Sequence, residues 1–186
     1  MRYDPITEKP FCCVPAVLQM ILTRRGLPCM SQGEIGWELG LLVPPEVKSA
    51  FTRVHIGTQP PAGYGTRISN PEYSIENFFN RNRLPLRITR VSPSSYEELT
   101  ATLQDTLDRE YDVVICFNSQ RLFGDGDREH VALVEAFNSA AGRVTLLDPA
   151  IGAPKHRTAS IDKIFETIQA HDASALGGLW LISEAP

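Results

Sequence analysis

The chain has 186 residues, of which 42% are hydrophobic, and its formal net charge is −4. This size and composition are typical of one globular domain with a sizeable core, so we expect a single domain over residues 1–186. The acidic balance provides no general basic field, which excludes nucleic acid and an anionic membrane surface as expected main partners.

The N-terminal half predicts helices. From Pro15 to about Arg25, apolar residues recur at three- and four-residue spacing. Pro15 suits the first turn, where its missing N–H costs nothing, so Cys13 is expected at or near the N-cap. Ser31 and Glu34 form a capping-box pattern at the start of a second helix, which is predicted to end near Leu41.

Residues 43–70 are rich in proline, glycine and polar residues, which predicts a loop-rich insertion rather than regular structure. The run Gly63-Tyr64-Gly65-Thr66 has no lysine and no flanking strand and helix, so it is not interpreted as a phosphate loop. Beyond the insertion, the pattern predicts these elements: a short helix over Ser74–Arg83 with Ile75, Phe78 and Phe79 buried, a strand over Leu86–Val91, and a helix from Ser94 to about Arg109.

The remaining chain predicts a sheet. Short apolar runs rich in strand-forming residues occur at Val113–Phe117, Val131–Phe137, Val144–Leu147 and Leu179–Ile182. The segment Phe137–Arg143, which contains a glycine and polar residues, predicts a turn, so the second and third of these strands are expected to form an antiparallel pair. Helices first and an antiparallel sheet second indicate an α+β fold, with the N-terminal helical part packed on the C-terminal sheet.

Three residues in this framework have the chemistry of a nucleophilic site. Cys13 begins a helix, where free amide groups and the positive end of the helix dipole favour thiolate. His130 begins one predicted strand and Asp148 follows the next, so antiparallel pairing allows the two to meet at one sheet edge. A cysteine nucleophile needs an imidazole to take its proton and a third group to orient the ring. The pattern therefore predicts a Cys-His-Asp catalytic constellation.

The other thiols and imidazoles are given structural interpretations. Cys12 is predicted to pack on the core face, and Cys29 and Cys116 are also expected in the core. A redox pair of Cys12 and Cys13 is disfavoured because vicinal cysteines close a strained ring. The remaining histidines are expected at the surface: His55, His156 and His171.

The cysteine count and the chain start suggest a location. Four irregularly spaced cysteines are typical of reduced thiols rather than of a disulfide framework or a zinc site. The start of the chain has no signal-peptide pattern, and no apolar run approaches the roughly twenty residues that cross a bilayer. We therefore expect a cytoplasmic protein with no membrane span, no metal and no cofactor.

Three motifs carry a resemblance to a known family: Cys13-Val14-Pro15-Ala16 with the following Leu18-Gln19-Met20-Ile21-Leu22, then His130-Val131-Ala132-Leu133-Val134, and Leu147-Asp148-Pro149. They resemble the papain-like cysteine peptidases, most of all the bacteriocin-processing branch that cleaves double-glycine leaders. The resemblance implies a papain-like fold with Cys13 as nucleophile, His130 as general base and acid, and Asp148 as the orienting partner.

The chain departs from this family pattern at two positions. Val14 stands where the family usually has glycine. Thr7 stands where the family usually has a glutamine whose amide helps to bind the oxyanion, and the neighbouring Glu8 cannot donate when ionised. An oxyanion site would then use the Cys13 backbone N–H and another donor such as Asn118 or Gln120.

The sequence therefore predicts a thiol-dependent hydrolase, a cysteine peptidase or amidase that works through an acyl-enzyme and takes a peptide or other amide or acyl substrate. The same three residues fit acyl transfer to an amine. An alternative of another class is a papain-like module that binds peptide without turnover, which Thr7 favours and the presence of all three site residues disfavours. The substrate and the number of subunits stay open.

Overall fold

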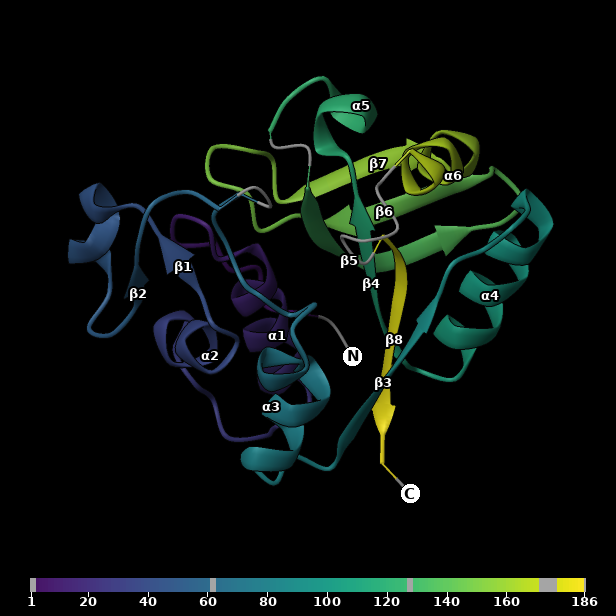
Figure 1. Cartoon of the computed structure of the whole chain (residues 1–186). Coiled ribbons are helices and arrows are strands. Elements are labelled where there is room, and N and C mark those ends of the chain that lie inside the picture. The colour runs from purple at the N-terminus through teal and green to yellow at the C-terminus, as the bar shows by residue number, and fades with distance from the viewer. Residues whose placement is uncertain (1–2, 61–62, 127–128, 171–176, 186) are drawn as a thin grey trace. The chain divides into compact units, whose positions relative to one another are not determined.

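The computed structural model describes residues 3–60, 63–126, 129–170 and 177–185. The chain divides into two compact units, Met1–Pro85 and Leu86–Pro186. Among the described residues, the regular structure of the first unit is mainly helical, and the second unit contains a six-stranded antiparallel sheet with helices (Figure 1). The predicted α+β class, with helices first and an antiparallel sheet second, is confirmed. The expectation of one domain over 1–186 stays a prediction.

The first unit is built around three α-helices: α1 (Cys13–Arg24), α2 (Gln32–Glu38) and α3 (Ile75–Arg81). α1 is apolar on nearly every side, because eight of its residues between Val14 and Leu22 are buried. The predicted capping box starts α2: Glu34 N–H donates to Ser31 Oγ at 3.3 Å, and Ser31 N–H donates to the Glu34 carboxylate at 2.7 Å. α3 buries the predicted residues Ile75, Phe78 and Phe79.

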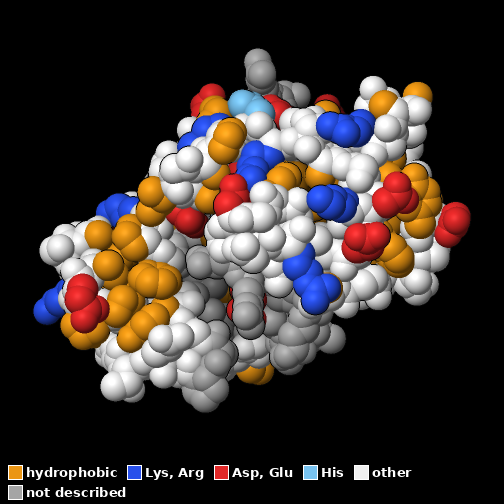
Figure 2. Space-filling model, turned by 90° about the horizontal axis from the view of Figure 1, so that it is seen from above, with side chains coloured by type: hydrophobic (Ala, Val, Ile, Leu, Met, Phe, Trp, Pro, Cys, Tyr) orange, Lys and Arg blue, Asp and Glu red, His pale blue; other side chains and the backbone are white. Residues whose placement is uncertain are grey.

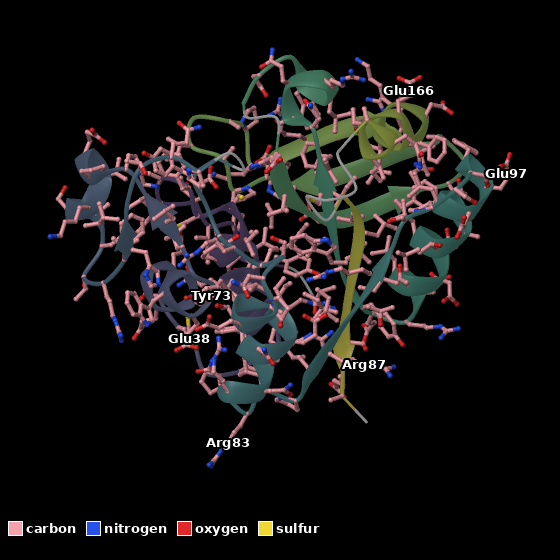
Figure 3. The ribbon with its side chains drawn as sticks, in the orientation of Figure 1. Glu38, Tyr73, Arg83, Arg87, Glu97 and Glu166 are labelled. Carbon is pink, nitrogen blue, oxygen red and sulfur yellow. The ribbon has the colours of Figure 1, made fainter. Side chains whose placement is uncertain are left out.

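The predicted insertion is largely irregular. It contains, or is flanked by, β1 (Leu42–Val43), the 3₁₀ turn η1 (Pro45–Ala50), β2 (His55–Ile56) and η2 (Pro71–Tyr73). Two-residue strands β1 and β2 pair in parallel. Side chains tie the neighbouring helices together: Arg81 Nε donates to the Glu38 carboxylate at 2.7 Å. The labelled Glu38 and Tyr73 lie among the elements of this unit (Figure 3).

The second unit contains one sheet in the order β3-β8-β4-β5-β6-β7, and every neighbouring pair is antiparallel. Its strands are β3 (Leu86–Val91), β4 (Asp112–Phe117), β5 (His130–Asn138), β6 (Arg143–Leu147), β7 (His156–Ser160) and β8 (Gly178–Glu184). The pattern missed β7 because this edge strand is polar, and only Ala159 within it is buried.

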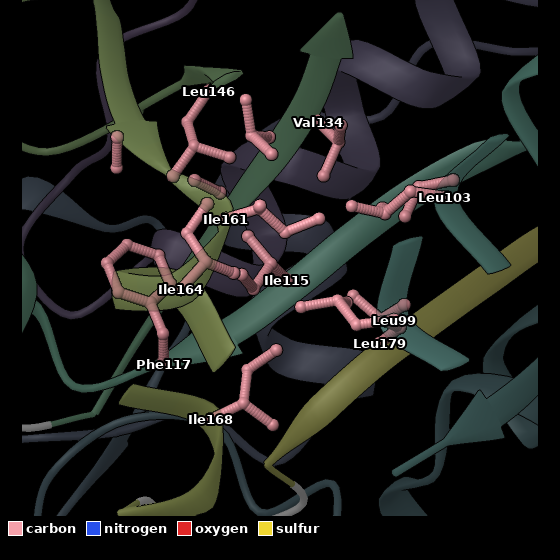
Figure 4. Packing of buried hydrophobic residues seen from close by; sticks show 14 of the residues in the cluster. Leu99, Leu103, Ile115, Phe117, Val134, Leu146, Ile161, Ile164, Ile168 and Leu179 are labelled. Carbon is pink, nitrogen blue, oxygen red and sulfur yellow. The ribbon is translucent and has the colours of Figure 1, made fainter. Parts of the chain in front are cut away.

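Within the described part of this unit, three helices accompany the sheet: α4 (Tyr96–Asp108), α5 (Ser119–Phe123) and α6 (Ile161–Gln169). Only α4 was predicted. α6 is amphipathic, with Ile161, Ile164 and Ile168 buried, so its apolar spacing is a signal from which this helix could have been predicted. Apolar side chains of α4, α5 and α6 pack with those of β4, β5, β6, β7 and β8 in one core (Figure 4). Members labelled there include Leu99, Leu103, Ile115, Val134, Leu146, Ile164, Ile168 and Leu179.

Charged side chains of both signs are interspersed on the face of the molecule shown in Figure 2. This distribution agrees with the mixed composition of 18 Lys and Arg against 22 Asp and Glu residues. Among the residues that the structure describes, helices long and apolar enough to cross a membrane are absent.

Gly178, at the start of β8, is a position where glycine is required. Its φ is +115°, and a Cβ added there would lie 2.5 Å from the Val91 carbonyl oxygen. We expect Gly178→Ala to lower the free energy of unfolding by at least about 2 kcal/mol, since backbone strain and a clash act together. Urea-induced unfolding measures this loss.

Gly152→Ala is the matched control. Gly152 also has a positive φ, +77°, but an added Cβ there would have no atom within 4 Å. Only conformational strain remains, so its expected cost is about 1 kcal/mol. Equal losses in the two variants would contradict the close approach of β3 to Gly178.

Candidate active site

Cys13 is the first residue of α1, and its side chain is half-buried. The first hydrogen bond of the helix runs from Ala16 N–H to the Cys12 carbonyl at 2.8 Å, and Pro15 has no N–H. The amides of Cys13 and Val14 therefore have no acceptor within the helix. The sulfur is placed at the positive end of a twelve-residue helix, as the sequence predicted.

A tight turn at residues 9–12 precedes this helix. Cys12 N–H donates to the Lys9 carbonyl at 2.9 Å, and Phe11 has a φ of +64°. A side chain other than glycine in this left-handed region costs roughly 1–2 kcal/mol. The Phe11 ring lies against Tyr64, with ring centroids 5.5 Å apart. An aromatic pair thus holds a strained turn two residues before Cys13.

Cys12 and Cys13 have different environments. Cys12 is fully buried and packs with Leu41, Val43 and Phe51, which confirms its predicted packing role. Burial above all, with the neighbouring Cys13 thiol and the Glu8 carboxylate, raises the pKa of Cys12 to about 12. Cys12 is therefore a poor nucleophile at neutral pH.

The other two thiols, Cys29 and Cys116, also differ in burial. Cys116 is buried in β4, as predicted, whereas Cys29 is exposed, so its predicted core position is wrong. Cys29 lies in the connection between α1 and α2, outside any apolar periodicity, where Gln19 and Thr23 are its polar neighbours. All four cysteines are free thiols.

Glu8, and not Thr7, faces the Cys13 thiol. A carboxylate oxygen of Glu8 lies within 4.8 Å of the Cys13 sulfur. The buried Gln32 fixes this geometry, because its amide donates to the Thr7 carbonyl at 3.0 Å and its oxygen accepts from Lys9 N–H at 2.6 Å. Thr7 itself is exposed. An ionised carboxylate offers no hydrogen-bond donor.

The structure brings His130 and Asp148 together in the second unit. His130 Nε2 lies 2.7 Å from Asp148 Oδ1, and their side chains are 6% and 0% exposed. The β5–β6 pairing places the start of one strand beside the end of the next, which is the arrangement expected from the sequence. Cys13 belongs to the first unit.

Asp148 is held as an ionised acceptor. Burial favours its neutral form, but the hydrogen bond and charge of His130, the Ala150 N–H and the Arg157 guanidinium outweigh burial and lower the pKa of Asp148 below its ordinary 3.8. The Ala150 amide donates to Asp148 Oδ1 at 2.9 Å. Because an ionised carboxylate only accepts, His130 donates to it from Nε2.

The two side chains considered as extra oxyanion donors have local roles. Asn118 caps α5, where its Oδ1 accepts from Arg121 N–H at 2.9 Å. Gln120 is exposed, and its amide donates to the Gly124 carbonyl at 3.2 Å. Neither contact points to a role in binding substrate.

Several residues of the site region were not found from the sequence. Glu8 was considered only as a neighbour of Thr7, because the turn that directs it toward Cys13 leaves no periodic signal. Arg157 was missed because β7 was not predicted, so its register against β6 was unknown. Of the remaining histidines, His156 is exposed as expected, His55 is half-buried against Trp37, and His171 lies outside the described residues.

The first unit also has a pocket of about 540 Å³ between α2 and the insertion, and Cys13 does not line it. The Arg53 guanidinium lies 3.5 Å from the Trp37 ring centroid at this pocket, and Trp37 stacks on His55 at 4.2 Å. Burial, with the charges of Arg67 and Arg53, lowers the pKa of His55 and keeps the stacked ring neutral at pH 7.

Two solved structures share this fold. The peptidase domain of Streptococcus ComA, a bi-functional ABC transporter involved in a quorum-sensing pathway, aligns with 100% of this chain and 99% of its own, at 16% identity and a TM-score of 0.53. A protein from Bacillus anthracis that is described as a C39-like peptidase aligns with 99% of this chain and 96% of its own, at 15% identity and a TM-score of 0.61. Searches for a matching sequence family and for a curated relative found none. The resemblance to the papain-like, bacteriocin-processing branch is therefore confirmed as a shared fold.

Proposed function

We propose that this chain is a thiol-dependent hydrolase of the papain-like type that cleaves a peptide or another amide through an acyl-enzyme. Cys13 is the nucleophile, His130 the general base and acid, and Asp148 the group that orients His130. The observation that carries the proposal is the buried His130–Asp148 pair, in which the Asp148 carboxylate orients the His130 ring through Nε2. A second support is the thiol at the start of α1.

The chemistry follows from these groups. His130 takes the thiol proton, the Cys13 sulfur attacks the substrate carbonyl carbon, and the carbonyl oxygen becomes an oxyanion. The Cys13 backbone N–H donates to that oxyanion. His130 then gives its proton to the departing amine, which leaves a thioester on Cys13. Water that loses a proton to His130 attacks the thioester, and the acid product and free thiol are released.

The substrate we propose is a peptide or another amide, met in the cytoplasm. The two structural neighbours are described as peptidases, which supports this substrate class. The four free cysteines, one of them exposed, suit a reducing compartment. The proposed reaction draws on side chains and backbone amides alone and needs no cofactor.

A papain-like module that binds peptide without turnover is the competing function. One observation favours it: the side chain beside the Cys13 thiol is the carboxylate of Glu8, which offers no donor to an oxyanion when ionised. The two functions differ in the reactivity of the Cys13 thiol.

The test is the rate of iodoacetamide alkylation at each cysteine from pH 5 to pH 9, read by peptide mass spectrometry in the wild type and in His130→Ala. We expect Cys13 to react well below the pH at which an ordinary thiol does, and this low-pH reactivity to disappear in His130→Ala. Exposed Cys29 is the internal reference for an ordinary thiol, and buried Cys12 for a shielded one. If Cys13 follows Cys29 at every pH in both proteins, the hydrolase proposal fails and the binding module is favoured.

A further inference from the structure

The His130–Asp148 pair belongs to a closed series of side-chain contacts that also includes Phe117, Phe123 and Arg157. The His130 ring packs edge-on against Phe117 at 5.7 Å, and Phe117 packs edge-on against Phe123 at 6.1 Å. The Arg157 guanidinium lies 3.6 Å from the Phe123 ring centroid and returns to the pair, with Nη1 at 3.4 Å from Asp148 Oδ2. Each carboxylate oxygen of Asp148 therefore has a side-chain donor: His130 on one and Arg157 on the other.

Arg157 reaches this position through strand register. It pairs with Leu146 on β6, two residues before Asp148, so its side chain extends along the end of β6. The side chain is only 10% exposed, which removes most of its water and strengthens its interaction with nearby charges. Both terminal nitrogens of Arg157 donate to the carboxylate of Asp125, in the turn after α5, at 2.9 Å.

We propose that Arg157 is a positioning residue of the candidate catalytic site: its guanidinium holds the second oxygen of Asp148, so that the carboxylate stays ionised and aimed at His130 Nε2. This inference deepens the proposed function and rests on it, because a fixed Asp148 matters only if His130 acts as base and acid. Asp125 and Phe123 also contact Arg157, and the effect on His130 comes from the guanidinium charge beside Asp148.

The contacts support a role for the charge of Arg157 and not for its bulk alone. Asp148 is fully buried, and a buried carboxylate without a cation nearby is driven toward its neutral form. The other cation beside Asp148 among the described residues of this unit is Lys155. Its ammonium donates to the Pro149 and Ala150 carbonyls at 3.1 Å and not to the carboxylate. Asp125 offsets part of the Arg157 charge, and the His156–Glu135 pair occupies the neighbouring strands.

The experiment follows the His130 Nε2–H proton by NMR, which requires no substrate and no knowledge of activity. In the wild type we expect a low-field imidazole resonance at pH 7 that exchanges slowly with water and is absent in His130→Gln. In Arg157→Met, which keeps the apolar contact with Phe123 but removes the charge, we expect exchange to be at least about tenfold faster. The pH at which Asp148 takes up its proton should rise by roughly one unit. Arg157→Lys should recover part of both effects.

Asp125→Asn is the control for a merely structural role. It removes the ion pair between Asp125 and Arg157 but leaves the Arg157 charge beside Asp148. The His130 resonance should therefore exchange as slowly as in the wild type, and the pH at which Asp148 takes up its proton should stay the same or fall. Equal effects of Arg157→Met and Asp125→Asn, or an unchanged resonance in Arg157→Met, would overturn the inference. A wild type without the resonance would overturn it as well, since the pair would not be fixed.

The outcomes are independent of those for the proposed function. Slow alkylation of Cys13 together with a protected, Arg157-dependent His130 proton would refute the hydrolase and leave the positioning contact standing as a geometric fact. Rapid, His130-dependent alkylation together with no effect of Arg157→Met would refute only the role of Arg157. Thermal unfolding of each variant confirms that the signals are compared between folded proteins.

Discussion

Asp148→Asn is expected to slow Cys13 alkylation at pH 7 by roughly tenfold or more, because an orienting acceptor is lost and the His130 tautomer is no longer imposed. An asparagine oxygen can still accept from His130 and Ala150, but its NH₂ group then faces the Arg157 guanidinium, donor against donor. We expect this buried clash to lower the free energy of unfolding by about 1–3 kcal/mol.

A double-mutant cycle with Arg157→Met separates the clash from the loss of the acceptor. In the Arg157→Met background the opposing donors are gone, so Asp148→Asn should cost distinctly less stability than it does in the wild type. Urea-induced unfolding of the four proteins measures this coupling. Additive losses would show that the two side chains do not interact.

The same carboxylate gives the protein a defined pH dependence. The folded pKa of Asp148 lies below 3.8, so its ionised form contributes stability above that value and the contribution is lost as the pH falls through the folded pKa. In Asp148→Asn this contribution is absent at every pH. The difference in unfolding free energy between wild type and variant should therefore shrink below about pH 4.

Glu8→Gln is expected to raise the reactivity of the proposed site at neutral pH. The change removes a negative charge within 4.8 Å of the Cys13 sulfur and supplies an amide that can donate to an oxyanion. One oxyanion donor is worth about a hundredfold to a thousandfold in rate, so we expect amide hydrolysis to increase by at least about tenfold. Hydrolysis of a mixed peptide library, followed by mass spectrometry, measures this increase.

Thr7→Gln is the control suggested by family spacing. The resemblance places the oxyanion glutamine at residue 7, but Thr7 is exposed and its carbonyl is bound by Gln32, while Glu8 faces the thiol. Thr7→Gln should therefore leave the rate within about twofold of the wild type, as is usual for an exposed substitution. A gain from Thr7→Gln with none from Glu8→Gln would show that the family spacing identifies the donor correctly and that the observed turn does not.

The predictions from sequence succeeded where local signals were strong. The capping residues Ser31 and Glu34 placed the start of α2, and the strand β3 was predicted at its exact bounds. The meeting of His130 and Asp148 followed from one turn and the alternation of two strands, and the structure has the pair at 2.7 Å. Two elements were not predicted. β7 is a polar edge strand without an apolar pattern, and α6 was missed although one of its faces is apolar.

In the candidate site, too, some features follow from local sequence and others depend on tertiary contacts. The neighbouring residues in the sequence determine that Cys13 begins a helix, because proline in the first turn and apolar spacing act within a few residues. Local sequence also determines which strands carry His130 and Asp148. The partners of those residues depend on contacts between segments far apart in the chain. Gln32 turns Glu8 toward Cys13 from 24 positions away, and Arg157 reaches both Asp125, 32 positions away, and Asp148. Periodicity and capping report only the neighbours of a residue along the chain, so the sequence by itself determined the proposed reacting groups, and only tertiary packing decided which charges surround them.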